Sequence, residues 1–125
     1  MSVVRIEQRA AHLAGNVRLQ FVHGTEGRTA KGTVTVISNT RFGSGQDRKD
    51  VPTAIQWTLW GKLAESAAQY LAKGSHVNIV GHLANNNYKD REGQDVYGFN
   101  FVVEEIDYLD TKEQAEARRA AAVPA

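Results

Sequence analysis

The chain has 125 residues, of which 42% are hydrophobic, and this length and composition suit one globular domain with a substantial core. It contains no cysteine, which excludes disulfides and thiolate metal sites and fits a reducing compartment. The net charge of +1 is unevenly distributed, because residues 1–103 carry 12 Lys and Arg against 8 Asp and Glu, whereas residues 104–125 carry 3 against 6. The positive charge of residues 1–103 is compatible with a polyanionic partner but does not require one.

In chain order, alternation and β-branched residues predict five strands. They span residues 11–22, 33–38, 53–61, 75–88 and 95–109. The first strand is expected to bend or bulge at Gly15 and Asn16. Residues 23–32 are turn material, and residues 39–52 form a long polar loop of a kind that is often functional in small domains. The segment KDREG predicts a hairpin turn that ends at Gly93.

One helix is expected between the third and fourth strands, over residues 62–74. Leu63, Ala67 and Leu71 recur there at four-residue spacing, and Gly74 stands where a left-handed C-terminal cap belongs. This element order is that of a five-stranded oligonucleotide-binding (OB) barrel, an all-β fold, although a small sandwich with one helix has the same order. We expect the barrel to occupy residues 1–109, followed by a flexible or short helical tail over 110–125.

Side-chain parity separates the two tryptophans. In the third strand the odd positions are uniformly apolar and the even positions are mixed, so Trp57 is expected in the core and Trp60 on the outer face. In the fourth strand the inner set is Val77, Ile79, Gly81 and Leu83, and the outer set is His76, Asn78, Val80 and His82. The outer parity, carried onward, reaches Tyr88. In the last strand the inward set is Tyr97, Phe99, Phe101 and Val103.

Trp60 and Tyr88 are therefore predicted to be aromatic side chains on a polar face. An exposed large ring needs a reason, such as a partner surface or base stacking. The alternative is that Trp60 packs under a loop or in a subunit interface, and parity alone leaves both open.

Two stretches carry a specific resemblance. WGKLAESAAQYLAKGSHVNIVGHL (residues 60–83) followed by YKDREGQDVYGFNFVV (residues 88–103) resembles the bacterial single-stranded DNA-binding protein family. The shared features are an aromatic-Gly-Lys-Leu-Ala-Glu run, Tyr-Leu-x-Lys-Gly-x-x-Val, a Gly-x-Leu strand, and an Asp-x-x-Gly-Gln hairpin after a Trp or Tyr. The looser resemblance extends over about residues 12–109.

The resemblance implies an OB barrel that assembles as a homotetramer, with a dimer as the alternative, and binds single-stranded DNA without sequence preference in replication, recombination or repair. It implies no catalysis, no cofactor and a nucleoid-associated location in the bacterial cytoplasm. By position, the implied stacking residues are Trp60 and Tyr88, with Phe42 near the family's loop aromatic. The implied phosphate contacts are Lys62 and Lys73, with Arg41, Arg48 and Lys49 as further candidates in the loop.

The chain also departs from the family pattern. Ala54 stands where a Trp is usual, Gln56 where an Arg is frequent, and ANNN (residues 84–87) where a basic stretch is common. The usual Asp-Pro after the first strand is missing. We therefore expect a lower affinity or a smaller site. The ending RRAAAVPA has neither the acids nor the aromatic tip of the family's recruitment peptide, so recruitment of repair proteins through an acidic tail is not expected.

Other function classes are less well supported. The sequence shows no nucleophile motif, and Gly43–Gly45 lacks the rest of a nucleotide fingerprint. His76 and His82 share a strand face six residues apart, which is a weak basis for a metal site. Residues 1–15 lack the apolar stretch of a signal peptide, and no apolar run approaches the roughly 18 residues of a membrane span. An OB adaptor that makes mainly protein contacts, as in a primosome, and a single-stranded RNA binder remain alternatives.

Overall fold

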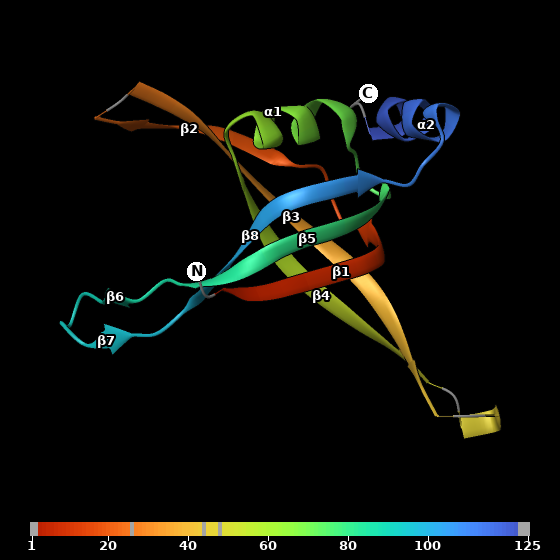
Figure 1. Cartoon of the computed structure of the whole chain (residues 1–125), viewed down its shortest axis with the longest axis horizontal. Helices are drawn as coiled ribbons and strands as arrows, with labels where there is room; N and C mark the ends of the chain where they lie inside the picture. The colour runs from red at the N-terminus through yellow and green to blue at the C-terminus, as the bar shows by residue number, and fades with distance from the viewer. Residues whose placement is uncertain (1–2, 26, 44, 48, 123–125) are drawn as a thin grey trace.

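The computed structural model describes residues 3–25, 27–43, 45–47 and 49–122 (Figure 1). The side chains of Arg41, Phe42 and Asp47 are outside this description. The elements in chain order are β1 (Val4–Leu13), β2 (Arg18–Gly24), β3 (Gly27–Phe42), a 3₁₀ turn (Gly45–Asp47), β4 (Lys49–Trp60), α1 (Gly61–Tyr70), β5 (His76–Asn85), β6 (Tyr88–Lys89), β7 (Asp95–Val96), β8 (Phe99–Tyr108) and α2 (Lys112–Ala122).

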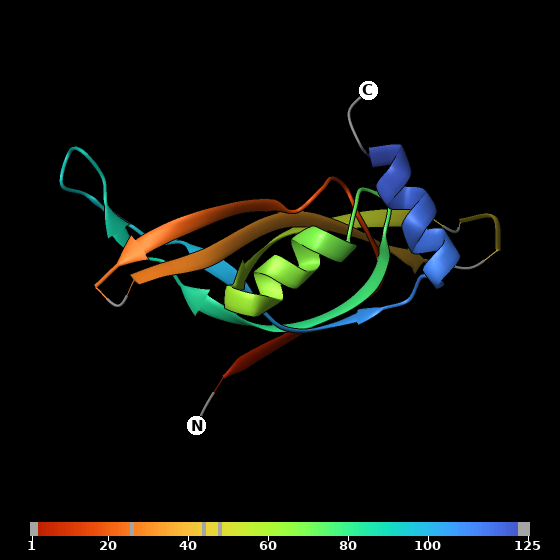
Figure 2. The same cartoon turned by 90° about the horizontal axis from the view of Figure 1, so that it is seen from above.

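The sheet curls into a barrel with the predicted OB topology. Its strand order is β1-β5-β8-β4-β3-β2, and β1 also pairs with β3, which closes the sheet on that side. On the other side β4 and β8 run parallel and are in register only at Trp57–Phe101 and Thr58–Val102. Helix α1 connects β4 to β5, as predicted, and it lies across one end of the barrel (Figure 2). The OB barrel is thereby confirmed over the sandwich.

The first predicted strand is interrupted where expected. The chain leaves the ladder after Leu13 and re-enters it at Arg18, so β1 and β2 are two parts of one bent OB strand. The strand begins at Val4, earlier than the predicted residue 11. A register shift between Gln8 and Ala11, with Ala10 at a φ of 51°, interrupts the regular alternation of β1 just before the predicted start.

Strands β3 and β4 extend well beyond the barrel, so the predicted turn at 23–32 and loop at 39–52 are mostly strand. The two strands pair continuously from Lys31–Trp60 to Phe42–Lys49, and their outer part, residues 39–42 and 49–52, forms a two-stranded arm outside the barrel (Figure 1). The β4 residues of the arm, and those that follow up to Ala54, are all exposed, so this strand buries no core there. A strand that is polar on both faces carries no period-2 hydrophobic signal, which is why this part reads as a loop.

Helix α1 is shorter than predicted, and Gly74 is not its C-terminal cap. The helix ends at Tyr70, and Leu71 is already extended, with φ −103° and ψ 148°. The chain leaves the helix there because Leu71 and Ala72 are buried and the Ala72 N–H donates to Ser75 Oγ at 2.9 Å. Gly74 is in the following turn, with a φ of 90°, a conformation that favours glycine.

The segment after the barrel is helical. The Thr111 Oγ1 and Gln114 side chains exchange hydrogen bonds with the backbone at the start of α2. Asp110, whose side chain is largely buried, accepts hydrogen bonds from Arg118 Nε at 2.9 Å and from the His76 backbone N–H at 3.3 Å, so it ties α2 to β5 of the barrel. Neither helix in the described part of the chain is long and apolar enough to cross a membrane.

The core confirms the parity prediction for β4. Trp57 and Leu59 are fully buried, and the Trp57 ring meets Phe101 edge-on at 5.9 Å. The Trp57 indole N–H donates to Gln8 Oε1 at 2.8 Å, so its one polar atom is satisfied inside the barrel. Trp57 is therefore a core residue whose polar atom depends on β1.

Candidate nucleic-acid interface

Trp60 lies at the junction where β4 ends and α1 begins. Its side chain is 44% exposed, as parity predicts. The backbone of Trp60 is extended, and Gly61 follows with a φ of 63°, which allows the chain to turn sharply from strand to helix. Lys31, the cross-strand partner of Trp60, holds its ammonium 5.5 Å from the centre of the indole. The junction thus presents an exposed ring with a cation over it.

A hollow of about 380 Å³ lies between β4 and β8, and we call it the β4–β8 hollow. It forms where these two strands diverge from their short parallel pairing. Its lining combines hydroxyl, amide and ammonium groups with two phenyl rings. The lining residues are Lys31, Thr33, Ala54, Ile55, Gln56, Thr58, Phe99, Asn100 and Phe101.

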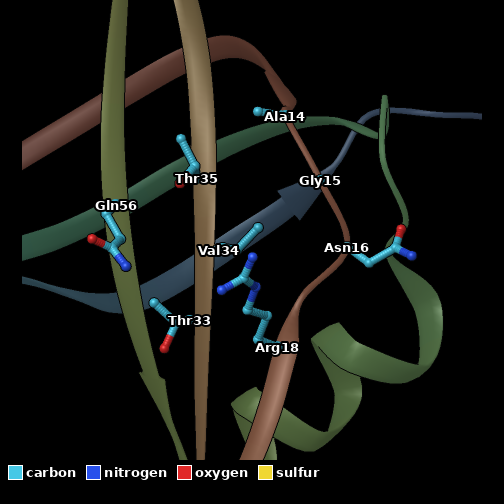
Figure 3. Close-up of a pocket in the computed structure, with 8 residues that line it drawn as sticks. All are labelled: Ala14, Gly15, Asn16, Arg18, Thr33, Val34, Thr35 and Gln56. Carbon is cyan, nitrogen blue, oxygen red and sulfur yellow. The ribbon is translucent and has the colours of Figure 1, made fainter.

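A second hollow, of about 410 Å³, lies over β3 beside the break between β1 and β2 (Figure 3). Its lining residues are Ala14, Gly15, Asn16, Arg18, Thr33, Val34, Thr35 and Gln56. In Figure 3 the Arg18 side chain extends from β2 toward β3. Thr33 and Gln56 line both hollows, so the two adjoin across β3 and β4. Together with Trp60 they form one polar surface, which we call the outer face.

Tyr88 lies apart from this surface, on the hairpin of β6 and β7. Its side chain is 56% exposed, and Tyr97, which lines the same shallow hollow, is 75% exposed. The predicted turn is present: Asp90 Oδ1 accepts the backbone N–H groups of Glu92 and Gln94, and Gly93 has a φ of 79°. Figure 1 shows this hairpin projecting from the barrel on the side opposite the tip of the β3–β4 arm.

The predicted cations are not gathered at one place. Lys62 is exposed in the first turn of α1. Lys73 is exposed in the turn after α1, and its backbone N–H donates to Asn16 Oδ1 at 2.8 Å, which places it beside the second hollow. Lys49 is exposed at the far end of the β3–β4 arm. The backbone of Arg41 and Phe42 belongs to β3, but their side chains, and all of Arg48, lie outside the described residues.

Sequence reasoning missed four residues of these surfaces. Lys31 and Arg18 were in segments taken as turn and bent strand, and only the register places them beside Trp60 and over β3. The inward prediction for Tyr97 and Phe99 was wrong, because they are 75% and 60% exposed. Parity gives the side of a strand but not where the barrel ends. β8 begins at Phe99, so of the four residues predicted to face inward Phe101 and Val103 reach the interior.

One tyrosine away from the outer face, Tyr108, has a raised pKa. Burial, with a smaller contribution from Tyr70, raises the pKa of Tyr108, which lies near α2. His76 stacks on His12 with ring centres 4.5 Å apart, and His82 Nδ1 lies 2.9 Å from Glu104 Oε1. In the described parts of the chain, no group of three His, Asp or Glu side chains could hold a metal ion. The outer face thus offers hydrogen bonds, cations and rings.

Comparison with known proteins also points to a nucleic-acid interface. A model of the "Single-strand binding protein family" matches residues 10–109. "Single-stranded DNA-binding protein 1" of Clostridium acetobutylicum is 32% identical over 100 residues, which cover 80% of this chain and 88% of the relative. "Single-stranded DNA-binding protein 2" of Listeria innocua is 33% identical over 92 residues, 74% of this chain and 57% of the relative. The Lactiplantibacillus plantarum "Single-stranded DNA-binding protein" is 33% identical over 97 residues, 78% of this chain and 48% of the relative.

The matched region thus spans about half the length of the Listeria and Lactiplantibacillus relatives and most of the Clostridium one. The matched residues include β2 to β8, α1, the Trp60 junction and the Tyr88 hairpin. On these grounds the chain belongs to the single-strand binding protein family.

Proposed function

We propose that this protein binds single-stranded DNA without sequence preference and without catalysis, by stacking bases on aromatic rings and contacting phosphates with cations. The observation that carries the proposal is the half-exposed Trp60 ring at the edge of the polar outer face, with Lys31 over it. Every base has a face that can stack on a ring, and phosphates attract Lys and Arg whatever the sequence. The curated relatives named above bear the matching activity in their names.

The proposed roles follow position. Trp60 and Tyr88 are the stacking residues. Lys62, Lys73 and Lys49 are phosphate contacts, to which the outer face adds Lys31 and Arg18. Phe42, Arg41 and Arg48 are proposed from the resemblance alone.

The proposed setting is replication, recombination or repair in the bacterial cytoplasm at the nucleoid, with the protein as a homotetramer or a dimer. An adaptor that makes only protein contacts is not favoured, because the family and the exposed rings both point to nucleic acid. Single-stranded RNA remains an outcome of the test, since stacking and phosphate contacts do not read the 2′-hydroxyl.

Titration with oligo(dT) tests the proposal directly. Trp60 is exposed and Trp57 is buried, so binding should quench the Trp60 fluorescence. The logarithm of the affinity should fall with the logarithm of the salt concentration by about 0.7 per phosphate contact. Trp60→Ala should weaken binding by roughly 1–3 kcal/mol and leave the fold intact. Lys31→Ala should lower the salt slope by about 0.7.

Two further measurements complete the test. Sedimentation with and without oligo(dT) gives the oligomeric state and the stoichiometry, and oligo(U) gives the preference between DNA and RNA. Absence of any salt-dependent oligonucleotide binding would refute the proposal and favour an OB adaptor that makes protein contacts.

A further inference from the structure

Phe99 is an exposed phenyl ring with no role in the core. It is 60% exposed at the first position of β8. Two residues further on, on the same side of β8, Phe101 packs edge-on against Trp57 and is partly buried. The two phenylalanines therefore differ in what they do: one completes the barrel interior, and the other leaves an apolar ring open to solvent, which needs a reason.

The surroundings of Phe99 supply that reason. It lines the β4–β8 hollow opposite Gln56 and Thr58 of β4, whose amide and hydroxyl groups can both donate and accept hydrogen bonds. Ala54 is also in the lining, and its small side chain leaves room on the β4 side. The volume of about 380 Å³ falls within the roughly 300–1,000 Å³ that is typical of small-molecule sites.

Lys31 connects this hollow to Trp60. It is part of the hollow lining, and its ammonium also lies 5.5 Å from the Trp60 ring centre. A DNA phosphate held by Lys31 would thus lie between two aromatic rings, Trp60 at the helix junction and Phe99 at the start of β8. A ring, polar edges and a cation are what an unpaired nucleotide requires.

We propose that the β4–β8 hollow receives one unpaired nucleobase, stacked on Phe99, separate from the base that Trp60 holds. This rests on the single-stranded DNA binding proposed above. The ligand class is any nucleobase, because the hollow offers stacking and adaptable hydrogen bonding.

The first test compares Phe99→Ala with a matched control, Phe21→Ala. Phe21 is also an exposed phenylalanine, at 39%, but it pairs with Ala30, one position away from Lys31, so it points to the opposite side of β3. At fixed salt, Phe99→Ala should raise the Kd for oligo(dT) by about 5- to 30-fold, the equivalent of roughly 1–2 kcal/mol. The salt slope should stay unchanged because no charge is removed. Phe99→Tyr and Phe21→Ala should both stay within about twofold of the original Kd.

The second test keeps a ring at the site, so it does not depend on how Phe99→Ala folds. In the double variant Trp60→Phe, Phe99→Trp, the introduced indole is the one exposed tryptophan, since Trp57 is buried. Oligo(dT) should quench it. The role of Phe99 would be overturned, and the proposed function kept, by three results together. They are an unchanged Kd for Phe99→Ala, an unquenched indole in the double variant, and weaker binding by Trp60→Ala. Absence of oligo(dT) binding by the unsubstituted protein would overturn the proposed function as well.

Discussion

The buried pair Gln8 and Trp57 offers a sharp test of how the barrel is held together. Gln8 Oε1 accepts the only polar hydrogen of a fully buried indole, at 2.8 Å. Its amide nitrogen donates to Val36 O at 3.0 Å, with longer contacts to Ser38 Oγ at 3.2 Å and Thr53 O at 3.3 Å. One side chain thus connects β1 to both β3 and β4.

Gln8→Leu replaces the amide by an apolar side chain of similar size and leaves the indole N–H buried without an acceptor. An unsatisfied buried polar group costs about 1–3 kcal/mol, and the Val36 carbonyl also loses a donor. We expect the free energy of unfolding to fall by about 2–4 kcal/mol, a large part of the roughly 5–15 kcal/mol of a typical domain. The same change at Gln69, exposed on α1, should stay within about 0.5 kcal/mol.

The assay is urea unfolding followed by circular dichroism, at one protein concentration because association shifts apparent stability. Trp57→Phe removes the donor instead of the acceptor, and it should cost about 2–4 kcal/mol through the unpaired Gln8 oxygen and the smaller ring. In the double variant both polar partners are absent, so the combined loss should be smaller than the sum by about 1–2 kcal/mol. Additive losses, or no loss for Gln8→Leu, would refute the reasoning.

Two further predictions concern the rest of the barrel. Gly81→Ala should lower the free energy of unfolding by at least about 1–3 kcal/mol, because the added methyl would lie 2.6 Å from the Trp57 ring and closer still to the Val102 carbonyl oxygen. Urea unfolding measures this loss, with Ala84→Gly as a less buried control on β5. A free energy of unfolding equal to that of the original protein would contradict the prediction. Burial raises the pKa of Tyr108 above 10.0, so the folded state holds this proton more tightly than the unfolded state. The resulting contribution to the free energy of unfolding is present below pH 10 and is lost as the pH rises through the folded pKa. Tyr108→Phe should flatten the alkaline fall in Tm, and an identical fall in both proteins would exclude this cause.

The barrel itself was readable from the sequence where one side of each strand is buried. Ile55, Trp57 and Leu59 alternate with polar neighbours, and the helix and the Gly93 turn follow from local patterns. The fold class, the place of the helix and the inside position of Trp57 were therefore predictable. Where both sides of a strand meet solvent, as in the β3–β4 arm, the pattern vanishes and the strand reads as a loop.

The site was readable only in part, for a different reason. Trp60 was predicted because it breaks the polar face of its own strand. Lys31 and Arg18 became visible only with the register, which pairs residues distant in sequence. Phe99 was assigned to the wrong environment because parity cannot tell how far the core extends along a strand.

The parallel contact of β4 with β8, only two residue pairs long, bears on more than geometry. In the described part of the chain it shares with the β1–β3 pairing the shortest register in the main sheet, and the hollow opens directly beside it. Strands joined by so few residue pairs separate at a low free-energy cost, which would let the proposed base, whether a purine or a smaller pyrimidine, enter with little rearrangement. A bound base that contacts both strands would hold them together, so oligonucleotide binding should raise the Tm of the barrel and slow amide hydrogen exchange in β4 and β8.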